Sequence, residues 1–182
     1  MAGKFSFQLR SEERRRAFPH KIIIGQREGE SATHVVLKLL GYLLFFRERL
    51  QIEPRLDLDL IPYEPDLLQF DYELRPVLWV ECGECNVAKL DRLAVKVPEA
   101  EIWVIKRSVA DAETLLRYMA KEKLRRQRYQ LIGLEAELVT ELTGLLAARN
   151  EVYWVGGGFD PPEMRFEFNG LWFELPFQIR SF

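Results

Sequence analysis

Two acidic residues, Asp66 and Glu81, have the types and the spacing best suited to chemistry. Asp66 follows a proline, and Glu81 comes 14 intervening residues later, at the end of an apolar segment. Carboxylates on neighbouring strands of a sheet can converge on one hard divalent cation such as Mg²⁺, which prefers oxygen ligands. A cation held in this way could activate water and offset charge on a phosphate. The pair is therefore a candidate site for a divalent cation, and the alternative is a simple turn at Asp66 with a strand-end surface acid at Glu81.

A third carboxylate belongs to a polar stripe on an otherwise apolar segment. Residues 32–47 are too rich in Val, Leu and Phe for a surface helix with a single apolar face, so we expect a helix packed on most sides. Glu30, His34 and Lys38 are spaced four apart and would share one side if helical geometry extends back to Glu30. This stripe must face something polar, and Glu30 could join the other two carboxylates.

The elements that position Glu81 are the best defined in the chain. Residues 77–82 are apolar on both faces, as in a central strand covered on both sides. A helix from Val87, stopped by Pro98, and a strand at 101–106 follow. We expect a strand–helix–strand unit with parallel strands. Glu81 would then lie at the carboxyl end of a strand, where open α/β sheets bind ligands.

The remaining pattern predicts one mixed α/β domain over residues 1–182, with a central sheet, no internal repeat and no linker. Asn169-Gly170 is typical of a tight hairpin. The Gly156–Gly158 run is typical of a flexible turn. Expected strands cover 4–10, 21–26, 56–60, 129–134, 151–155, 164–168 and 171–177, and expected helices cover 110–127 and 135–149.

Charge and composition limit the partners. The chain has 26 basic and 28 acidic residues, a net charge of −2 and 48% hydrophobic residues, so any nucleic-acid surface must be a local patch beside a normal core. The clusters at 10–21 and 121–128 are interleaved with acids, which favours solvated faces. Lys89, Arg92 and Lys96 form a smaller basic stripe better placed to bind nucleic acid beside the carboxylates.

The two cysteines offer a different chemistry. Cys82 and Cys85 form a CxxC pair at a strand-to-helix junction, where a thioredoxin-like redox site would lie, although Glu84 between them disfavours a thiolate. No second cysteine or histidine pair completes a zinc site. The few cysteines and the basic start predict a cytoplasmic protein, and the apolar run 35–46 is too short to span a membrane.

Four segments, in the same order, resemble the bacterial YaeQ family, which is regarded as a divergent form of the restriction-endonuclease fold. Asp66 followed by Glu81-Cys82-Gly83 is similar to a variant of the PD-(D/E)XK motif of that fold. The segments are Glu30-Ser31 leading into residues 38–44, residues 65–67, residues 78–84, and the closing hairpin with Trp172 and Glu174.

The resemblance implies a restriction-endonuclease-like mixed sheet flanked by helices, with a C-terminal hairpin. It also implies a phosphodiester hydrolase that depends on Mg²⁺ or Mn²⁺ and acts on nucleic acid. Asp66, Glu81 and Glu30 would be the metal-side carboxylates.

The sequence departs from the nuclease motif at its last position. The motif lysine, which positions or activates the attacking water, is replaced by Gly83. Glu84 follows directly, and Lys38 or Lys89 could reach the pocket in place of that lysine. The alternative is a non-catalytic module that kept the fold, lost the lysine and binds nucleic acid or protein.

Overall fold

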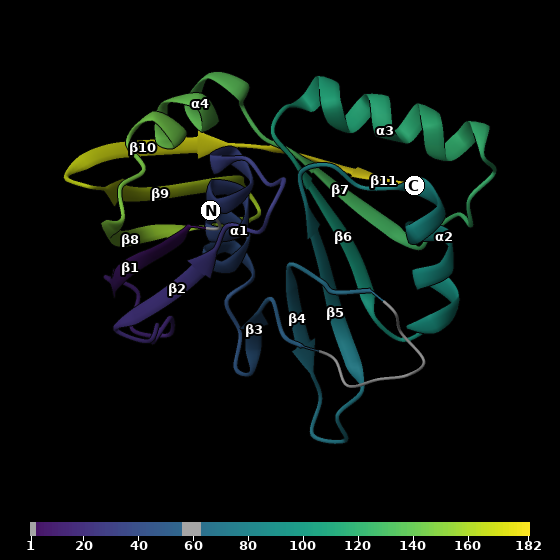
Figure 1. The fold of residues 1–182 in the computed structure, drawn as a ribbon, viewed down its shortest axis with the longest axis horizontal. Coiled ribbons are helices and arrows are strands. Elements are labelled where there is room, and N and C mark those ends of the chain that lie inside the picture. The colour runs from purple at the N-terminus through teal and green to yellow at the C-terminus, as the bar shows by residue number, and fades with distance from the viewer. Residues whose placement is uncertain (1–2, 56–62) are drawn as a thin grey trace.

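The computed structural model describes residues 3–55 and 63–182, whose strands form two mixed sheets (Figure 1). Sheet A has five strands in the order β10 (Leu171–Pro176), β9 (Pro162–Phe168), β8 (Arg149–Phe159), β1 (Lys4–Ser11) and β2 (Lys21–Gly25). Sheet B has six, in the order β11 (Gln178–Ser181), β7 (Tyr129–Gly133), β6 (Glu101–Lys106), β5 (Pro76–Cys82), β4 (Leu67–Phe70) and β3 (Leu50–Ile52). The mixed α/β class is confirmed.

The division into two sheets corrects the prediction of one central sheet. β8 pairs in parallel with β1, and β9 and β10 extend this separate sheet as antiparallel strands. The sequence could not show that there are two sheets, because the alternation of apolar and polar residues reveals which face of a strand is buried but not which strand it pairs with. Residues 171–177 form a hairpin with residues 164–168 at Asn169-Gly170, as predicted.

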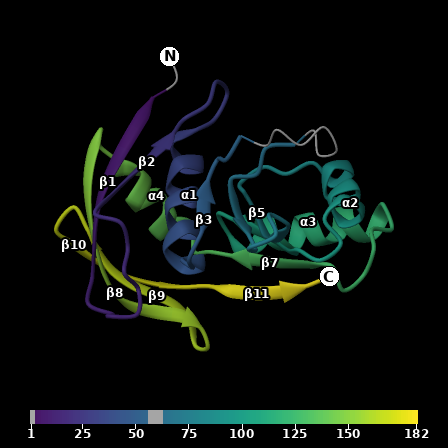
Figure 2. The ribbon, with the colours of Figure 1, turned by 90° about the horizontal axis from the view of Figure 1, so that it is seen from below.

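Helix α1 (Ala32–Phe45) lies between the two sheets (Figure 2) and contacts strands of both. Ser31 caps the helix through the main-chain N–H of His34, and every side chain from Val35 to Phe45 is buried. Gly41 allows the close approach to sheet B, since a Cβ there would lie 2.8 Å from Ile105 Cδ1. The prediction of a helix packed on most sides is therefore confirmed.

The strand–helix–strand unit is also confirmed. β5 and β6 pair in parallel, and α2 (Val87–Lys96) connects them. α2 and α3 (Val109–Lys121) pack with Trp79, Ile102 and Tyr129 in a second apolar cluster on the face of sheet B opposite α1. α4 (Ala136–Gly144) contacts α1.

Other predictions need correction or fall outside the described residues. The Gly156–Gly158 run lies inside β8 and is not a flexible turn. A Cβ at Gly157 would lie 2.3 Å from Glu163 O, so this glycine permits close pairing with β9. The strand expected at 56–60 lies outside the described residues, and β3, β4 and β11 were not predicted. No helix among the described residues is long and apolar enough to cross a membrane.

Candidate functional site

The polar stripe of α1 meets buried charges of opposite sign. Lys38 is fully buried, and its Nζ lies 2.7 Å from Glu30 Oε2 and 2.6 Å from Glu53 Oε1. Burial alone would raise the pKa of Glu30, but hydrogen bonds from Lys38 and the Arg27 main chain hold it below its ordinary value. The stripe faces polar groups as predicted, and Lys38 holds one oxygen of Glu30 while leaving Oε1 free of hydrogen bonds within the described residues.

Asp66 and Glu81 are brought together by neighbouring strands, as the spacing predicts. β4 begins directly after Asp66, and its antiparallel pairing with β5 sets Leu67 opposite Val80. Asp66 Oδ2 accepts a hydrogen bond of 2.7 Å from the main-chain N–H of Cys82. Burial would raise the pKa of Asp66, but the hydrogen bond and charge of His34, the main-chain hydrogen bond of Cys82 and the charge of Lys38 together hold it below its ordinary value.

Glu30, His34 and Asp66 together form a group that could hold a metal ion. One ligand atom from each residue lies within 4.8 Å of the other two. His34 Nε2 is 3.0 Å from Asp66 Oδ1 and 3.7 Å from Glu30 Oε1. Two carboxylate oxygens and one imidazole nitrogen suit a divalent cation, so the residues present fit the predicted ion. His34 was predicted only as a polar position on the helix.

Glu81 is adjacent to this group but already engaged. Its two oxygens accept hydrogen bonds from Trp79 Nε1 at 2.6 Å and from Lys89 Nζ at 2.8 Å. Burial raises the pKa of Glu81, partly offset by Lys89, and the nearby charge of Asp66 raises it further. Lys89 thus neutralises a buried acid, and Glu81 would have to exchange a partner to bind a metal.

A pocket of about 750 Å³ opens over the site. Glu30 comes just before α1, and His34 lies in its first turn. Gly83 and Glu84 directly follow β5, and Lys106 ends β6. The pocket therefore lies at the carboxyl ends of two parallel strands, where the sequence predicted ligand binding. Its full lining is Glu28, Gly29, Glu30, Ser31, Thr33, His34, Leu37, Gly83, Glu84, Lys106, Arg107 and Asp111.

The pocket includes Lys106, a residue that the sequence analysis missed, and neither Lys38 nor Lys89 lines it. Lys106 is 6% exposed, and its Nζ donates a 2.7 Å hydrogen bond to Gly83 O. The sequence feature that could have identified Lys106 is its position at the end of the apolar strand expected at 101–106. Glu53, the second partner of Lys38, was also missed.

Gly83 has a structural reason to be glycine. Its φ is +71°, and a Cβ at this position would lie 3.1 Å from His34 Nδ1. A lysine at the motif position would combine an unfavourable backbone conformation with crowding of the imidazole. The local structure that places His34 is therefore at odds with a lysine at position 83.

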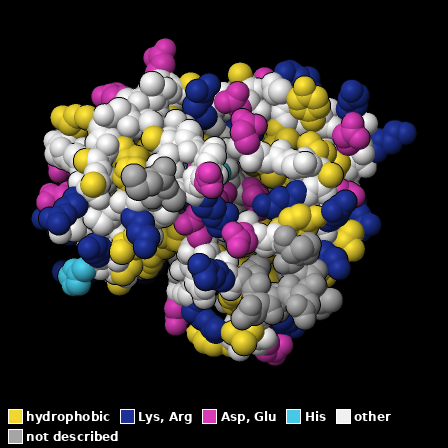
Figure 3. All heavy atoms as spheres, viewed as in Figure 1, with side chains coloured by type: hydrophobic (Ala, Val, Ile, Leu, Met, Phe, Trp, Pro, Cys, Tyr) yellow, Lys and Arg dark blue, Asp and Glu magenta, His cyan; other side chains and the backbone are white. Residues whose placement is uncertain are grey.

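The predicted nucleic-acid stripe on α2 is only partly free. Lys89 is paired with Glu81, Arg92 donates a hydrogen bond of 3.0 Å to Tyr63 Oη, and Lys96 is exposed. On the face drawn in Figure 3, acidic and basic side chains alternate in the middle of the molecule instead of forming a large basic patch.

The two cysteines are free thiols, one buried and one partly buried. Burial, reinforced by nearby carboxylates, raises the pKa of Cys82 well above its ordinary value and that of Cys85 to about 12. A redox-active thiol needs the opposite shift. The thiol redox alternative gains no support from this environment.

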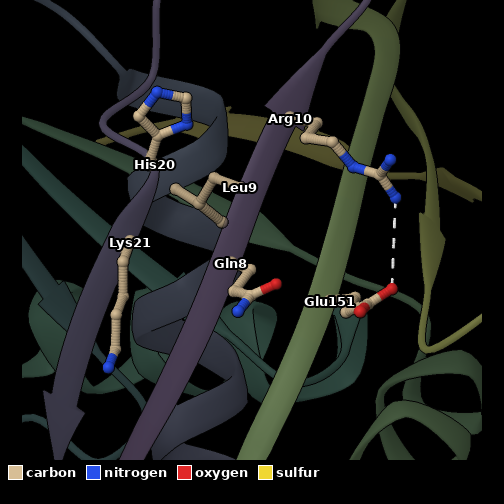
Figure 4. Close-up of a pocket in the computed structure, with 6 residues that line it drawn as sticks. All are labelled: Gln8, Leu9, Arg10, His20, Lys21 and Glu151. Atoms are coloured by element: carbon tan, nitrogen blue, oxygen red, sulfur yellow. Dashed lines mark ion pairs between the residues drawn. The ribbon is translucent and has the colours of Figure 1, made fainter.

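A separate hollow of about 440 Å³ lies on sheet A, lined by residues of β1, β2 and β8 (Figure 4). Arg10 Nη2 and Glu151 Oε2 are 4.0 Å apart, and both side chains are largely exposed. Lys21 and His20 lie on the other side of β1 in this view. Part of the N-terminal basic cluster is thus a solvated surface with an acidic neighbour.

The family model described as YaeQ protein matches residues 2–154. The chain belongs to the YaeQ family. This confirms the family resemblance, while the PD-(D/E)XK assignment stays a hypothesis. No curated protein matches the sequence.

Two solved YaeQ structures share the fold over nearly their whole length. The YaeQ protein from Xanthomonas axonopodis pv. citri has a TM-score of 0.77 at 20% identity, with 100% of this chain and 99% of that chain covered. The YaeQ protein from Pseudomonas syringae has a TM-score of 0.73 at 16% identity, with 100% and 96% covered. The closing strands beyond residue 154 are therefore part of the common fold.

Proposed function

We propose that this YaeQ family protein is a divalent-metal-dependent phosphodiester hydrolase that acts on nucleic acid, with a divergent PD-(D/E)XK site. The observation that carries the proposal is the group of Glu30, His34 and Asp66, whose ligand atoms lie within 4.8 Å of one another beside a pocket. Glu81, on the strand paired with β4, supplies the second acid of the motif.

The surrounding residues fix the orientation of these ligands. Lys38 and the Arg27 main-chain N–H hold one oxygen of Glu30, and the Cys82 main-chain N–H holds one oxygen of Asp66. Each carboxylate thus keeps its other oxygen near His34 Nε2. When bound, a divalent cation would supply an activated water and offset phosphate charge.

The supporting residues outside the metal group have separate proposed roles. Lys89 pairs with Glu81 at 2.8 Å and lowers the pKa of this carboxyl against the larger, opposite effect of burial. Arg92 and Lys96 are exposed on α2 and could contact nucleic-acid phosphates, which gives affinity without choice of sequence. Glu84 lines the pocket and could orient a water molecule.

Calorimetric titration of Mn²⁺ and Mg²⁺ into the purified protein tests the site directly. We expect binding in the wild type and at least tenfold weaker binding in Asp66→Asn, because this change removes a ligand charge but preserves shape. Asp111→Asn is the matched control, since Asp111 lines the same pocket outside the ligand group. Equal binding by the wild type and Asp66→Asn would refute the metal site.

Activity is tested with plasmid DNA, single-stranded DNA and RNA in the presence of Mn²⁺. We expect cleavage by the wild type and none by Asp66→Asn. Binding of metal and nucleic acid without cleavage of any of these substrates would contradict hydrolysis and favour the alternative, a binding module that has kept the fold.

A further inference from the structure

Three lysines lie near the candidate site, and they differ in how their charge is balanced. Lys38 is fully buried and has two carboxylates, at 2.7 and 2.6 Å. Lys89 has the Glu81 carboxylate at 2.8 Å. Burial of an ammonium group is costly unless it is paired, and these two lysines follow that rule.

Lys106 does not follow the rule that a buried ammonium group is paired with a carboxylate. Only 6% of this residue is exposed. Within the described residues its Nζ donates a hydrogen bond to the main-chain carbonyl of Gly83, and no carboxylate lies within 4.0 Å of it. A lysine ammonium has three donors, so a single carbonyl leaves two of them without a protein partner among the described residues. Lys106 also lines the pocket of about 750 Å³, so an anion there can reach it.

The position of Lys106 relative to the metal-side group comes from Gly83. The ammonium group lies 2.7 Å from Gly83 O, and a Cβ on the same glycine would lie 3.1 Å from His34 Nδ1. Lys106 from β6 and His34 from α1 thus both lie close to Gly83. Arg107 follows Lys106 and adds a second cation to the lining, 3.8 Å from Asp111.

We propose that Lys106 binds a phosphate group of the substrate in this pocket, beside the Glu30, His34 and Asp66 group. The inference deepens the proposed function, since it assumes that the pocket is the substrate site. The ammonium group would donate hydrogen bonds to a non-bridging phosphate oxygen while keeping its bond to Gly83 O. A charged hydrogen bond of this kind is stronger than a neutral one.

The probe is inorganic phosphate, titrated into metal-free protein and followed by calorimetry and ³¹P NMR. We expect wild-type protein to bind phosphate and Lys106→Met to bind it at least tenfold more weakly. The matched control is Lys21→Met, because Lys21 lines the separate hollow of Figure 4 beside Arg10 and His20. We expect Lys21→Met to bind phosphate as the wild type does.

A second measurement needs no variant and so does not depend on folding of Lys106→Met. Acylation of Lys106 in native protein, followed by mass spectrometry, should slow at least threefold with saturating phosphate, while acylation of Lys21 stays unchanged. Absence of phosphate binding in the wild type, or loss of binding in Lys21→Met alone, would overturn the proposal.

The two proposals fail separately. Phosphate binding that depends on Lys106 in a protein that binds no Mn²⁺ would support the anion site and refute metal-dependent hydrolysis. Mn²⁺ binding that depends on Asp66, with no phosphate protection of Lys106, would support the metal site and refute the role of Lys106.

Discussion

At the scale of single residues, His34 changes the chemistry expected of the site. The sequence predicts three carboxylates, a set that suits Mg²⁺, whereas the structure groups an imidazole with Glu30 and Asp66. Imidazole nitrogen is a common ligand of transition metals, while Mg²⁺ prefers oxygen ligands and keeps several waters. If the proposed site binds a metal, the identity of this one side chain would therefore shift its preference toward transition metals.

We predict that the protein binds Mn²⁺ at least tenfold more tightly than Mg²⁺ and that His34→Ala removes most of this difference. The reason is that the substitution leaves the oxygen ligands Glu30 and Asp66 in place and deletes the nitrogen. Competitive titration with Mn²⁺ followed by electron paramagnetic resonance measures both affinities. The prediction fails if His34→Ala weakens Mn²⁺ and Mg²⁺ binding by the same factor.

The thiols give a pH prediction that also tests the redox alternative. Because the pKa of Cys85 is raised to about 12, only roughly one thiol in ten thousand is ionised at pH 8. The thiolate is the reactive form, so the rate of alkylation by iodoacetamide should rise about tenfold per pH unit between pH 7 and 9.5 without a plateau. Cys82 is 1% exposed and its pKa is also raised well above its ordinary value by burial, so it should stay unmodified in native protein. A plateau near pH 8 would contradict the raised pKa.

At the scale of elements, the junction after β5 shows how local structure excludes a motif residue. Gly83 adopts φ +71°, its N–H bonds to Ile105 O at 2.9 Å, and its carbonyl accepts from Lys106. These bonds tie the junction to β6 and fix its conformation. The junction favours glycine because a side chain would crowd His34.

We expect Gly83→Ala to lower the free energy of unfolding by about 1–2 kcal/mol, the typical cost of a left-handed conformation for a residue with a Cβ. Urea denaturation measures the change. Gly144→Ala is the matched control: Gly144 ends α4 and a Cβ there meets nothing within 4 Å, so alanine should be neutral or stabilise by up to about 1 kcal/mol. Equal effects of the two substitutions would show that the junction is not strained by a Cβ.

Elements set by local pattern could be predicted from the sequence, and pairings between distant segments could not. The polar stripe on α1 and the β5–α2–β6 unit follow from periodicity. The spacing of Asp66 and Glu81 suits neighbouring strands, although β4 itself was not predicted. Lys106 meets Gly83 only because of the parallel register that sets Cys82 opposite Ile105. Likewise β1 pairs with β8, far along the chain, and no alternation of residue types encodes that partner.

At the scale of the whole molecule, the two sheets share one core. The larger apolar cluster contains Phe7 and Trp154 from sheet A, Leu78 and Ile132 from sheet B, and Leu40 from α1 between them. The C-terminal segment also joins the sheets, since β10 lies in sheet A and β11 in sheet B (Figure 2). A single domain over residues 1–182 stays a prediction.

We therefore predict that both sheets unfold in one cooperative transition. Hydrogen exchange measured by mass spectrometry at increasing urea should show β6 of sheet B and β9 of sheet A losing protection at the same midpoint. Gly41→Val overfills the contact between α1 and sheet B, where even a Cβ would lie 2.8 Å from Ile105 Cδ1, and should cost about 1–3 kcal/mol. Because α1 belongs to the core of both sheets, the two midpoints should fall together. A lower midpoint for β6 alone would show that sheet A folds as an independent domain.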